Sequence, residues 1–202
     1  DLMAMIVARG GSFSVSSLRA ATLTQGLLEK LKSTGQKTVT IAPEAGSERL
    51  RKTINKHLTR DQIIETVRMI SRTGDFSVKL YFLIGLPTET TEDIREITEL
   101  VKGIKHHMVK ESAERGRIGR IKLSVNSFVP KAFTPFQWFP MEELGIIKKK
   151  HKWLKKSLGK AGGIDVSSDI PKWAYVQTLL SMGDSRVGAI LLSADILGGD
   201  WT

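Results

Sequence analysis

The strongest pattern in this 202-residue chain is an apolar run that ends in a tight turn. Residues 78–84 read VKLYFLI, and nearly every position is apolar or aromatic. Such a run is typical of a strand covered on both faces, as parallel strands in α/β proteins are. Gly85, Leu86 and Pro87 follow, and proline ends strand pairing because it lacks a donor. We therefore expect a buried parallel strand that stops at Gly85.

Helical spacing begins directly after this turn. Thr90 can cap a helix, and apolar residues then recur every three or four positions, at Ile94, Ile97, Leu100, Val101, Ile104 and Met108. A strand, a glycine turn and an amphipathic helix make one βα unit, and such units place ligands at the carboxyl ends of their strands. A barrel strand that ends in an ordinary turn, without a ligand site, explains the same residues equally well.

Strand and helix patterns alternate along the rest of the chain. After a helix end at residues 2–8, the other predicted strands are 13–18, 38–42, 121–126 and a short one near 164–168. Further helices are predicted to begin at Thr24, Ser47 and Thr59, the last with a capping-box Gln62, and to span 141–159, 172–182 and 185–197.

Four βα units in succession predict an α/β fold, a partial TIM-type (β/α) barrel with right-handed crossovers. We expect the partial barrel in residues 1–160 and a C-terminal helical extension packed on it in residues 161–202. Four units are too few to close an eight-stranded barrel. The sequence therefore suggests a fragment of a larger domain.

Composition narrows the function classes. The chain contains no cysteine, which excludes disulfides and thiolate-bound metals within it. No apolar run approaches the ~20 residues that span a bilayer. Residues 2–8 are apolar but lack the basic lead of a secretory signal. We expect a cytoplasmic protein with no membrane partner.

The net charge of +10 favours anionic partners, and it is densest in residues 148–156, which read KKKHKWLKK. Apolar residues at helical spacing mark a buried stripe on the same helix, namely Leu144, Ile147, Trp153, Leu154 and Leu158. The lysines are therefore predicted to form its solvated face. The alternative interpretation is an RNA-contact patch.

Common hydrolytic and nucleotide-binding signatures do not occur in the sequence: there is no HExxH, GxSxG, GxGxxG or GxxxxGK[ST]. Polar residues do follow each predicted strand, where a barrel presents its ligands: Ser17, Arg19, Glu44, Ser47, Thr88, Glu89, Asn126 and Ser127. Glu44 stands in a loop of small residues that would let a carboxylate meet sugar hydroxyls. A charge that complements the next helix N-terminus explains Glu44 equally well.

The predicted exit loop at 127–138 is long and contains two prolines. Five aromatic residues lie between Phe128 and Phe139. Loops usually carry polar residues, so these aromatic side chains need an apolar surface to pack on.

Three runs together resemble a known family. They are IAPEAGSERLRKTINK at 41–56, LYFLIGLPTET at 80–90 and NSFVPKAFTPFQW at 126–138. In this order, on consecutive strand ends, they look like the second half of a radical S-adenosylmethionine (radical SAM) domain, similar to uncharacterised cobalamin-associated or methylthiotransferase-like members. The resemblance covers about residues 13–138 and continues more loosely through 171–175. It implies a (β/α)6 barrel of which this chain supplies about four units.

The resemblance implies contacts with S-adenosylmethionine at nine positions. They are Ser17, Arg19, Glu44, Lys56, Ile84, Gly85, Leu86, Phe128 and Val129. By position, Glu44 would contact the ribose and Lys56 the carboxylate, and the segments at 84–86 and 128–129 would line the adenine. At the first two positions many relatives carry an acidic residue and asparagine, so the sequence departs from the family pattern there.

The family binds a 4Fe–4S cluster through three cysteines in a CxxxCxxC loop, which the resemblance places upstream of Asp1. It therefore implies that the intact protein is a radical SAM iron–sulfur oxidoreductase or transferase. There the cluster would cleave S-adenosylmethionine to a 5′-deoxyadenosyl radical that modifies a substrate, and this chain alone would be inactive. Cobalamin held by an upstream domain is a further cofactor that the resemblance allows.

The alternative is a cysteine-free barrel module that binds RNA or a protein partner without catalysis. The expected partners are the missing N-terminal part of the domain and an unidentified substrate, with RNA as one option. Strand 13–18 would lose its neighbour in such a fragment. We therefore expect edge-to-edge pairing with a second copy, or cover by residues 2–8.

Overall fold

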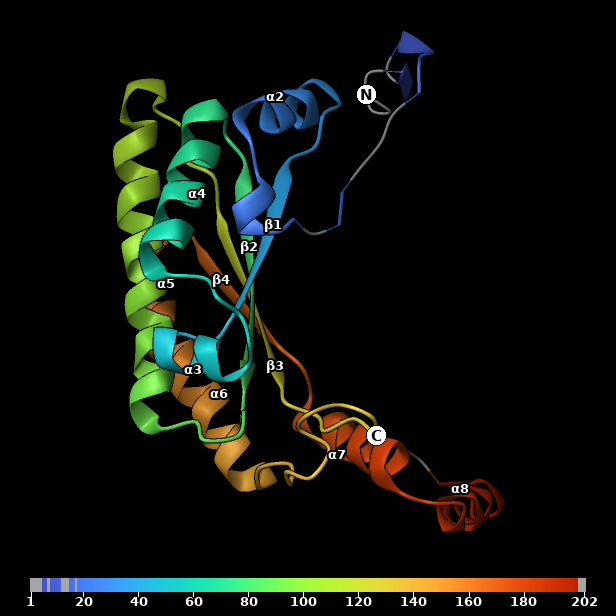
Figure 1. Ribbon diagram of the computed structural model, residues 1–202. Helices are drawn as coiled ribbons and strands as arrows, with labels where there is room; N and C mark the ends of the chain where they lie inside the picture. The colour runs from blue at the N-terminus through green and yellow to red at the C-terminus, as the bar shows by residue number, and fades with distance from the viewer. Residues whose placement is uncertain (1–4, 7, 12–14, 17, 200–202) are drawn as a thin grey trace.

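A parallel sheet of four strands organises the chain (Figure 1). The computed structural model describes residues 5, 6, 8–11, 15, 16 and 18–199. The strands lie side by side in chain order and are β1 (Thr38–Glu44), β2 (Ser77–Ile84), β3 (Ile121–Ser127) and β4 (Ile164–Ser168). The predicted α/β fold built from βα units is confirmed. The four described strands form an open sheet, as a partial barrel would.

The helices that connect the strands cover one face of this sheet (Figure 1). They are α3 (Glu48–Thr53), α4 (Arg60–Thr73), α5 (Thr91–Ser112) and α6 (Leu144–Gly159). The remaining elements are η1 (Ala20–Thr22), α2 (Gln25–Ser33), η2 (Ala113–Arg115), α7 (Pro171–Met182) and α8 (Arg186–Ile196). Apolar side chains of α2, α4, α5 and α6 join those of the strands in one core.

Burial alternates along β2, which corrects one prediction. The side chains that face the helices are fully buried: Val78, Leu80, Phe82 and Ile84. The side chains between them, Lys79, Tyr81 and Leu83, are only half-buried. The apolar run was expected to be covered on both faces, and for the second face this is wrong, because the connecting helices all lie on the first (Figure 1).

Four predicted helix starts are confirmed by capping hydrogen bonds. Each capping side chain accepts a bond from the N–H three residues further on: Thr24, Ser47, Thr59 and Thr90. Gln62 completes the predicted capping box with Thr59, and Asp93 completes a second one with Thr90. These caps satisfy backbone donors that a helix leaves free at its N-terminus.

Most of the predicted strand at 13–18 lies outside the described residues. Val15, Ser16 and Leu18 are described, and none of them is in a strand. The N–H of Leu18 donates to the Thr40 carbonyl of β1 at 3.1 Å, and Gln36 bonds both backbone groups of Val15. Edge-to-edge pairing through this segment stays a prediction.

The end of the chain departs from the sheet. Strand β4 pairs with β3, so the sheet extends past residue 160. Helices α7 and α8 then extend beyond the carboxyl ends of the strands, away from the helix layer (Figure 1). Many of their apolar side chains are exposed, including Tyr175, Leu180, Ile190, Leu192 and Ile196. Among the described helices, none is long and apolar enough to cross a bilayer.

The loop after β1 lies directly against α5. A Cβ atom added at Gly46 would collide with the backbone nitrogen of Ile97 and lie 2.7 Å from the carbonyl oxygen of Asp93. Both obstacles are helix backbone, which cannot move aside as a flexible side chain can. Gly46 is therefore required by close packing.

We predict that Gly46→Ala lowers the free energy of unfolding by about 2 kcal/mol or more, because the added methyl group forces the loop away from α5. Urea unfolding followed by circular dichroism measures this change. The matched control is Gly26→Ala in α2, where a Cβ meets nothing within 4 Å. That substitution is expected to stabilise the chain by up to ~1 kcal/mol through helix propensity. Equal effects of the two substitutions would contradict the close contact.

Candidate functional site

The exits of three neighbouring strands meet at one edge of the sheet. Strand β1 ends at Glu44, β2 is followed by Gly85, and β3 is followed by Phe128. The pairing of Ile84 with Ser127 puts the last residues of β2 and β3 side by side. Parallel strands point their carboxyl ends the same way, so all three exits lie at this edge, as expected. We call this region the carboxyl-edge site.

Glu44 leaves the sheet at an irregular point. The register between β1 and β2 shifts between Ile41 and Glu44, and Glu44 has a left-handed φ of 70°. Its Oε1 lies 3.4 Å from the Nζ of Lys56, and both side chains remain partly exposed. The structure thus pairs two of the residues proposed for cofactor contact. A partly exposed carboxylate can accept hydrogen bonds from hydroxyls, and the ammonium beside it can donate hydrogen bonds to an anion.

Arg51 holds the loop between these two residues. Its side chain is 1% exposed, and its guanidinium donates to the carbonyls of Ala45 at 3.0 Å, Gly46 at 2.7 Å and Leu58 at 2.6 Å. Burial lowers the pKa of Arg51, although the charges of nearby Glu48 and Glu96 act in the opposite direction. The bonds occupy carbonyls that would otherwise be buried without donors. Arg51 is therefore a structural support for Glu44.

A carboxylate from α5 secures the same loop from the other side. The Ser47 hydroxyl donates to Asp93, and so does the Arg49 guanidinium. Arg49 also donates to the carbonyl of Thr88 at 2.9 Å, which joins the exit loops of β1 and β2. Burial alone would raise the pKa of Asp93, but hydrogen bonds from Ser47, Arg49 and Thr90 lower it to about 2. Asp93 is thus held ionised where the two loops meet.

The turn after β2 is built around a buried charge cluster. Gly85 has a φ of +77°, which favours glycine, and its N–H donates to Oε1 of Glu89 at 3.0 Å. The Nζ of Lys150 lies 2.5 Å from the same oxygen and 2.6 Å from Oε1 of Glu142. The side chain of Glu89 is 2% exposed and that of Lys150 is 16% exposed. We call Glu89, Lys150 and Glu142 the turn cluster.

Burial and pairing oppose each other in the turn cluster. Burial raises the pKa of Glu89, and the bonds from Lys150 and the Gly85 N–H offset only part of that effect. Burial alone would lower the pKa of Lys150, but bonds to Glu142 and Glu89 raise it overall. Lys150 is therefore a fixed cation between two carboxylates. The lysines of the basic run were predicted to lie on a solvated face, and for Lys150 that prediction is wrong.

Sequence reasoning named Glu89 as a strand-exit residue but missed Lys150 and Glu142. Helical spacing contained a signal for Lys150, because it lies three residues after Ile147 and four before Leu154, and both are fully buried. Trp153, which was assigned to the buried stripe, is 38% exposed. The true stripe of α6 contains Ile147, His151, Leu154 and Leu158.

The apolar residues expected to line an adenine pack mostly on one another. Leu86 and Phe128 are 5% and 8% exposed and form a cluster with Ala45 and Leu50. The Ile84 side chain lies in the core on the helix side, while its carbonyl accepts the Phe128 N–H at 2.8 Å. Val129 is partly exposed. The side chains within reach of a ligand are therefore Glu44, Lys56 and Val129.

Some of the aromatic side chains in the loop after β3 pack on one another and on the apolar cluster, as expected. Phe128 and Phe136 meet edge to face at 6.1 Å between ring centroids, and Phe136 meets Phe139 at 5.8 Å. Phe133 and Trp138 are 99% and 85% exposed. The rings that pack thus extend the apolar cluster of the carboxyl edge, and the other two face outward.

Of the nine proposed contact residues, Arg19 does not join this site. Ser17 lies outside the described residues. Arg19 is exposed and follows Leu18, which bonds to Thr40 in the middle of β1. At about 3.3 Å per residue, Thr40 lies roughly 13 Å along the strand from Glu44. The structure therefore places Arg19 well away from the carboxyl edge.

A second polar cluster links the exits of β3 and β4. The N–H and hydroxyl of Ser127 donate to Asp169 at 3.0 and 3.2 Å, and Nε2 of His151 lies 3.3 Å from the same carboxylate. Burial lowers the pKa of His151, although Asp169 acts in the opposite direction. Because Ser127 donates to Asp169 and not to His151, the three do not form a nucleophile and its base. They join two strand exits.

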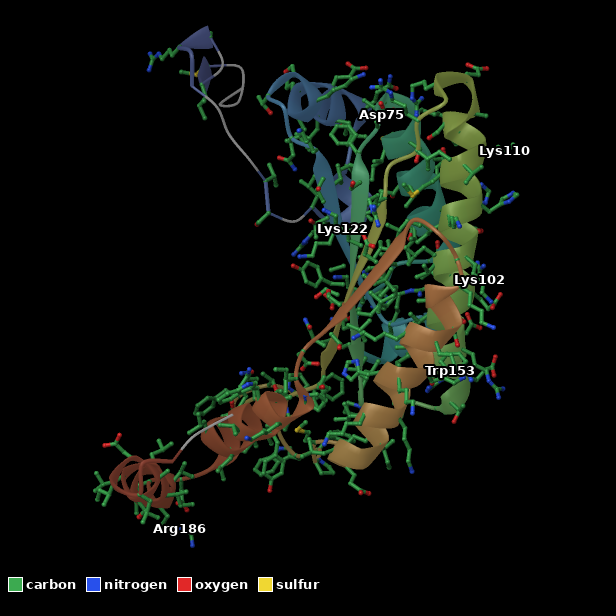
Figure 2. All side chains as sticks on the ribbon, turned by 180° about the vertical axis from the view of Figure 1, so that it is seen from behind. Asp75, Lys102, Lys110, Lys122, Trp153 and Arg186 are labelled. Carbon is green, nitrogen blue, oxygen red and sulfur yellow. The ribbon has the colours of Figure 1, made fainter. Side chains whose placement is uncertain are left out.

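The sheet face opposite the helices is polar. Its side chains include Lys79, Tyr81, Lys122 and Asp165, and Figure 2 shows Lys122 on the side away from the helices. A hollow of about 520 Å³ lies between Thr38 and Ser167 on this face. Within the described residues, no group of three histidine, aspartate or glutamate side chains could hold a metal ion.

Comparisons with known proteins identify relatives. The radical SAM superfamily model matches residues 2–101. An uncharacterised protein of Methanocaldococcus jannaschii is 40% identical over 90% of this chain, and a tRNA-2-methylthio-N(6)-dimethylallyladenosine synthase of Petrotoga mobilis is 30% identical over 44% of it. The matched regions span 37% and 20% of those proteins. A crystal structure from Burkholderia cenocepacia, described provisionally as a phosphonomutase, has a TM-score of 0.40 at 12% identity over 89% of this chain and 70% of its own.

We predict that Lys150→Met lowers the free energy of unfolding by about 2 kcal/mol or more at neutral pH, because it leaves the buried Glu89 and the adjacent Glu142 without their cation. The loss should shrink in acid, where protonation of Glu89 removes the uncompensated charge. Urea unfolding at several pH values measures both effects. Lys148→Met, which removes an exposed lysine of the same helix, is the control and should change stability by less than ~0.5 kcal/mol. Adding Glu89→Gln to Lys150→Met should recover stability, and a further loss would contradict this role.

Asp93 should make stability depend on pH in acid. Its pKa falls from 3.8 to about 2 on folding, so its contribution is complete above about pH 5 and is lost as the pH falls toward 2. The contribution amounts to about 2 kcal/mol. Urea unfolding of the wild type and Asp93→Asn between these pH values measures it, and the difference between the two proteins should narrow in acid. A constant difference across that range would contradict the lowered pKa.

Proposed function

Because this chain belongs to the radical SAM superfamily, we propose that its carboxyl-edge site contributes part of an S-adenosylmethionine site to an intact enzyme. The observation that carries the proposal is the pairing of Glu44 with Lys56 at 3.4 Å beside the Gly85 turn. Both are polar, partly exposed and fixed by a loop that Arg51 and Asp93 secure. A sugar and a charged amino acid group require such partners.

Each residue has a role that its chemistry allows. Glu44 would accept hydrogen bonds from the ribose hydroxyls. Lys56 has three donors, so it can keep its contact with Glu44 and still bind the carboxylate of the cofactor. Val129 and the Gly85 backbone would contact the adenine ring, and the turn cluster would hold that backbone in position.

The 4Fe–4S cluster of the superfamily does not fit the residues of this chain. Such clusters are bound by cysteine thiolates, and the chain has no cysteine. In the superfamily the cluster supplies the electron that cleaves S-adenosylmethionine. Any such ligands would have to come from outside these 202 residues, so we assign this chain a role in binding and no step of the redox chemistry.

We predict that the chain alone binds S-adenosylmethionine weakly, with a Kd near or above about 1 mM, because few contacts offset the cost of immobilising the ligand. Amide shift changes in a two-dimensional NMR titration should be confined to the exits of β1, β2 and β3. Glu44→Gln should reduce these changes, whereas Glu29→Gln on exposed α2 should not.

Two results would contradict the proposal. Shift changes at the amino ends of the strands would place the ligand elsewhere. Micromolar affinity by calorimetry, or 5′-deoxyadenosine formed with a chemical reductant, would contradict the assignment of only part of the site, and no redox step, to this chain.

A further inference from the structure

Helix α6 carries positive charge that no neighbouring side chain compensates. The helix contains no acidic residue. Five of its lysines are exposed, and among the described residues none has an ion-pair partner within 4 Å: Lys148, Lys149, Lys152, Lys155 and Lys156. Lys150 is the exception, because it faces the turn cluster. Like charges at this density repel one another, so the face favours an anionic partner.

Several basic residues of the neighbouring helices α4 and α5 do have acidic partners. On α4, Arg68 and Arg72 both bind Glu111 of α5 at 2.7 Å. On α5, Lys102 pairs with Glu99 at 2.8 Å and Arg95 with Glu92 at 3.1 Å. Basic residues of the helix layer are therefore usually paired where acidic residues are within reach. Exposed lysines elsewhere, such as Lys52 of α3 and Lys110 of α5, also lack an ion-pair partner within 4 Å among the described residues. What distinguishes α6 is their density, because five such lysines lie between residues 148 and 156.

An aromatic ring and a pocket lie among these lysines. Trp153 is 38% exposed, and Figure 2 shows it on the helix layer, on the opposite side of the sheet from Lys122. A pocket of about 250 Å³ separates α6 from the first turns of α5 and is lined by Thr91, Ile94, Arg95, Lys149, Lys150 and Trp153. An indole beside cationic groups can stack on a flat ring while the cations bind charge next to it.

We propose that this outer face of α6 binds single-stranded nucleic acid, with phosphates on the exposed lysines and one base stacked at Trp153. A membrane surface fits less well, because the apolar stripe of α6 is buried in the core and cannot enter a bilayer. An acidic protein would satisfy the lysines but gives no reason for an aromatic pocket among them. The surface lies on the helix side of the sheet, and it does not depend on the proposed cofactor site.

The lysines are tested through the salt dependence of binding. The probe is a fluorescein-labelled oligouridylate of roughly 12 nucleotides, within the ~4–16 nucleotides that single-strand binding folds cover. Fluorescence anisotropy of the chain and probe is measured between about 50 and 200 mM salt. The double variant Lys149→Gln, Lys152→Gln should make the negative slope of log K against log salt shallower by about 1.4, or about 0.7 per lost phosphate contact. The matched control, Lys52→Gln with Lys110→Gln, removes two exposed lysines of α3 and α5 and should leave the slope unchanged.

The base contact is tested separately. Trp153→Leu should weaken binding about fivefold or more without changing the salt slope, since stacking releases no counterions. Trp153→Phe should restore much of the affinity because it keeps an aromatic face. Thermal unfolding of each variant shows whether the fold is intact, and both aromatic variants are compared at equal folded fraction.

Several results would overturn the proposal. If the control variant changed the salt slope as much as the α6 variant, binding would depend on net charge alone. If heparin competed as well as unlabelled oligouridylate and Trp153→Leu did not weaken binding, the face would be a general polyanion surface. Stronger binding to vesicles that contain phosphatidylserine than to the oligonucleotide would identify a membrane surface.

Discussion

The apolar face of the parallel sheet, buried beneath α4, α5 and α6, is the interaction on which the other features of this structure depend. Side chains such as Leu80, Phe82 and Val125 are buried there and fix which face of each strand turns inward. Since the side-chain period of a strand is two, a slip of one residue would exchange the two faces. The register in turn determines which residues leave the sheet at its carboxyl edge. Glu44 and Gly85 lie at the same edge for this reason.

Buried charges then hold the exit loops on the helix layer. Asp93 reaches from α5 to the loop after β1, and Lys150 reaches from α6 to the turn after β2. Buried ion pairs add little net stability compared with apolar contacts, but removing one partner is costly. Their effect here is geometric, because each fixes a backbone segment next to the candidate site. Gly46 contributes in another way, by allowing the loop to touch the backbone of α5.

Three sides of helix α6 face three different surroundings. Its apolar stripe, with Leu154 at the centre, completes the core. Lys150 points to the turn cluster, and the remaining lysines with Trp153 face outward. One run of basic sequence therefore contains both a buried structural cation and an exposed surface. The two cannot be separated by composition, because lysine is the residue in both cases.

The sequence by itself determined the order of strands and helices, the helix caps at Thr59 and Thr90, the strand exits and the family, because these depend on local spacing and on short motifs. Glu44 and Glu89 could be named because they directly follow strands. Only the tertiary structure decided that Glu44 pairs with Lys56, and that Lys150 lies between Glu89 and Glu142. It also decided that the second face of β2 is only half-buried. These outcomes depend on contacts between segments far apart in the chain, and periodicity within a single segment does not specify its distant neighbours.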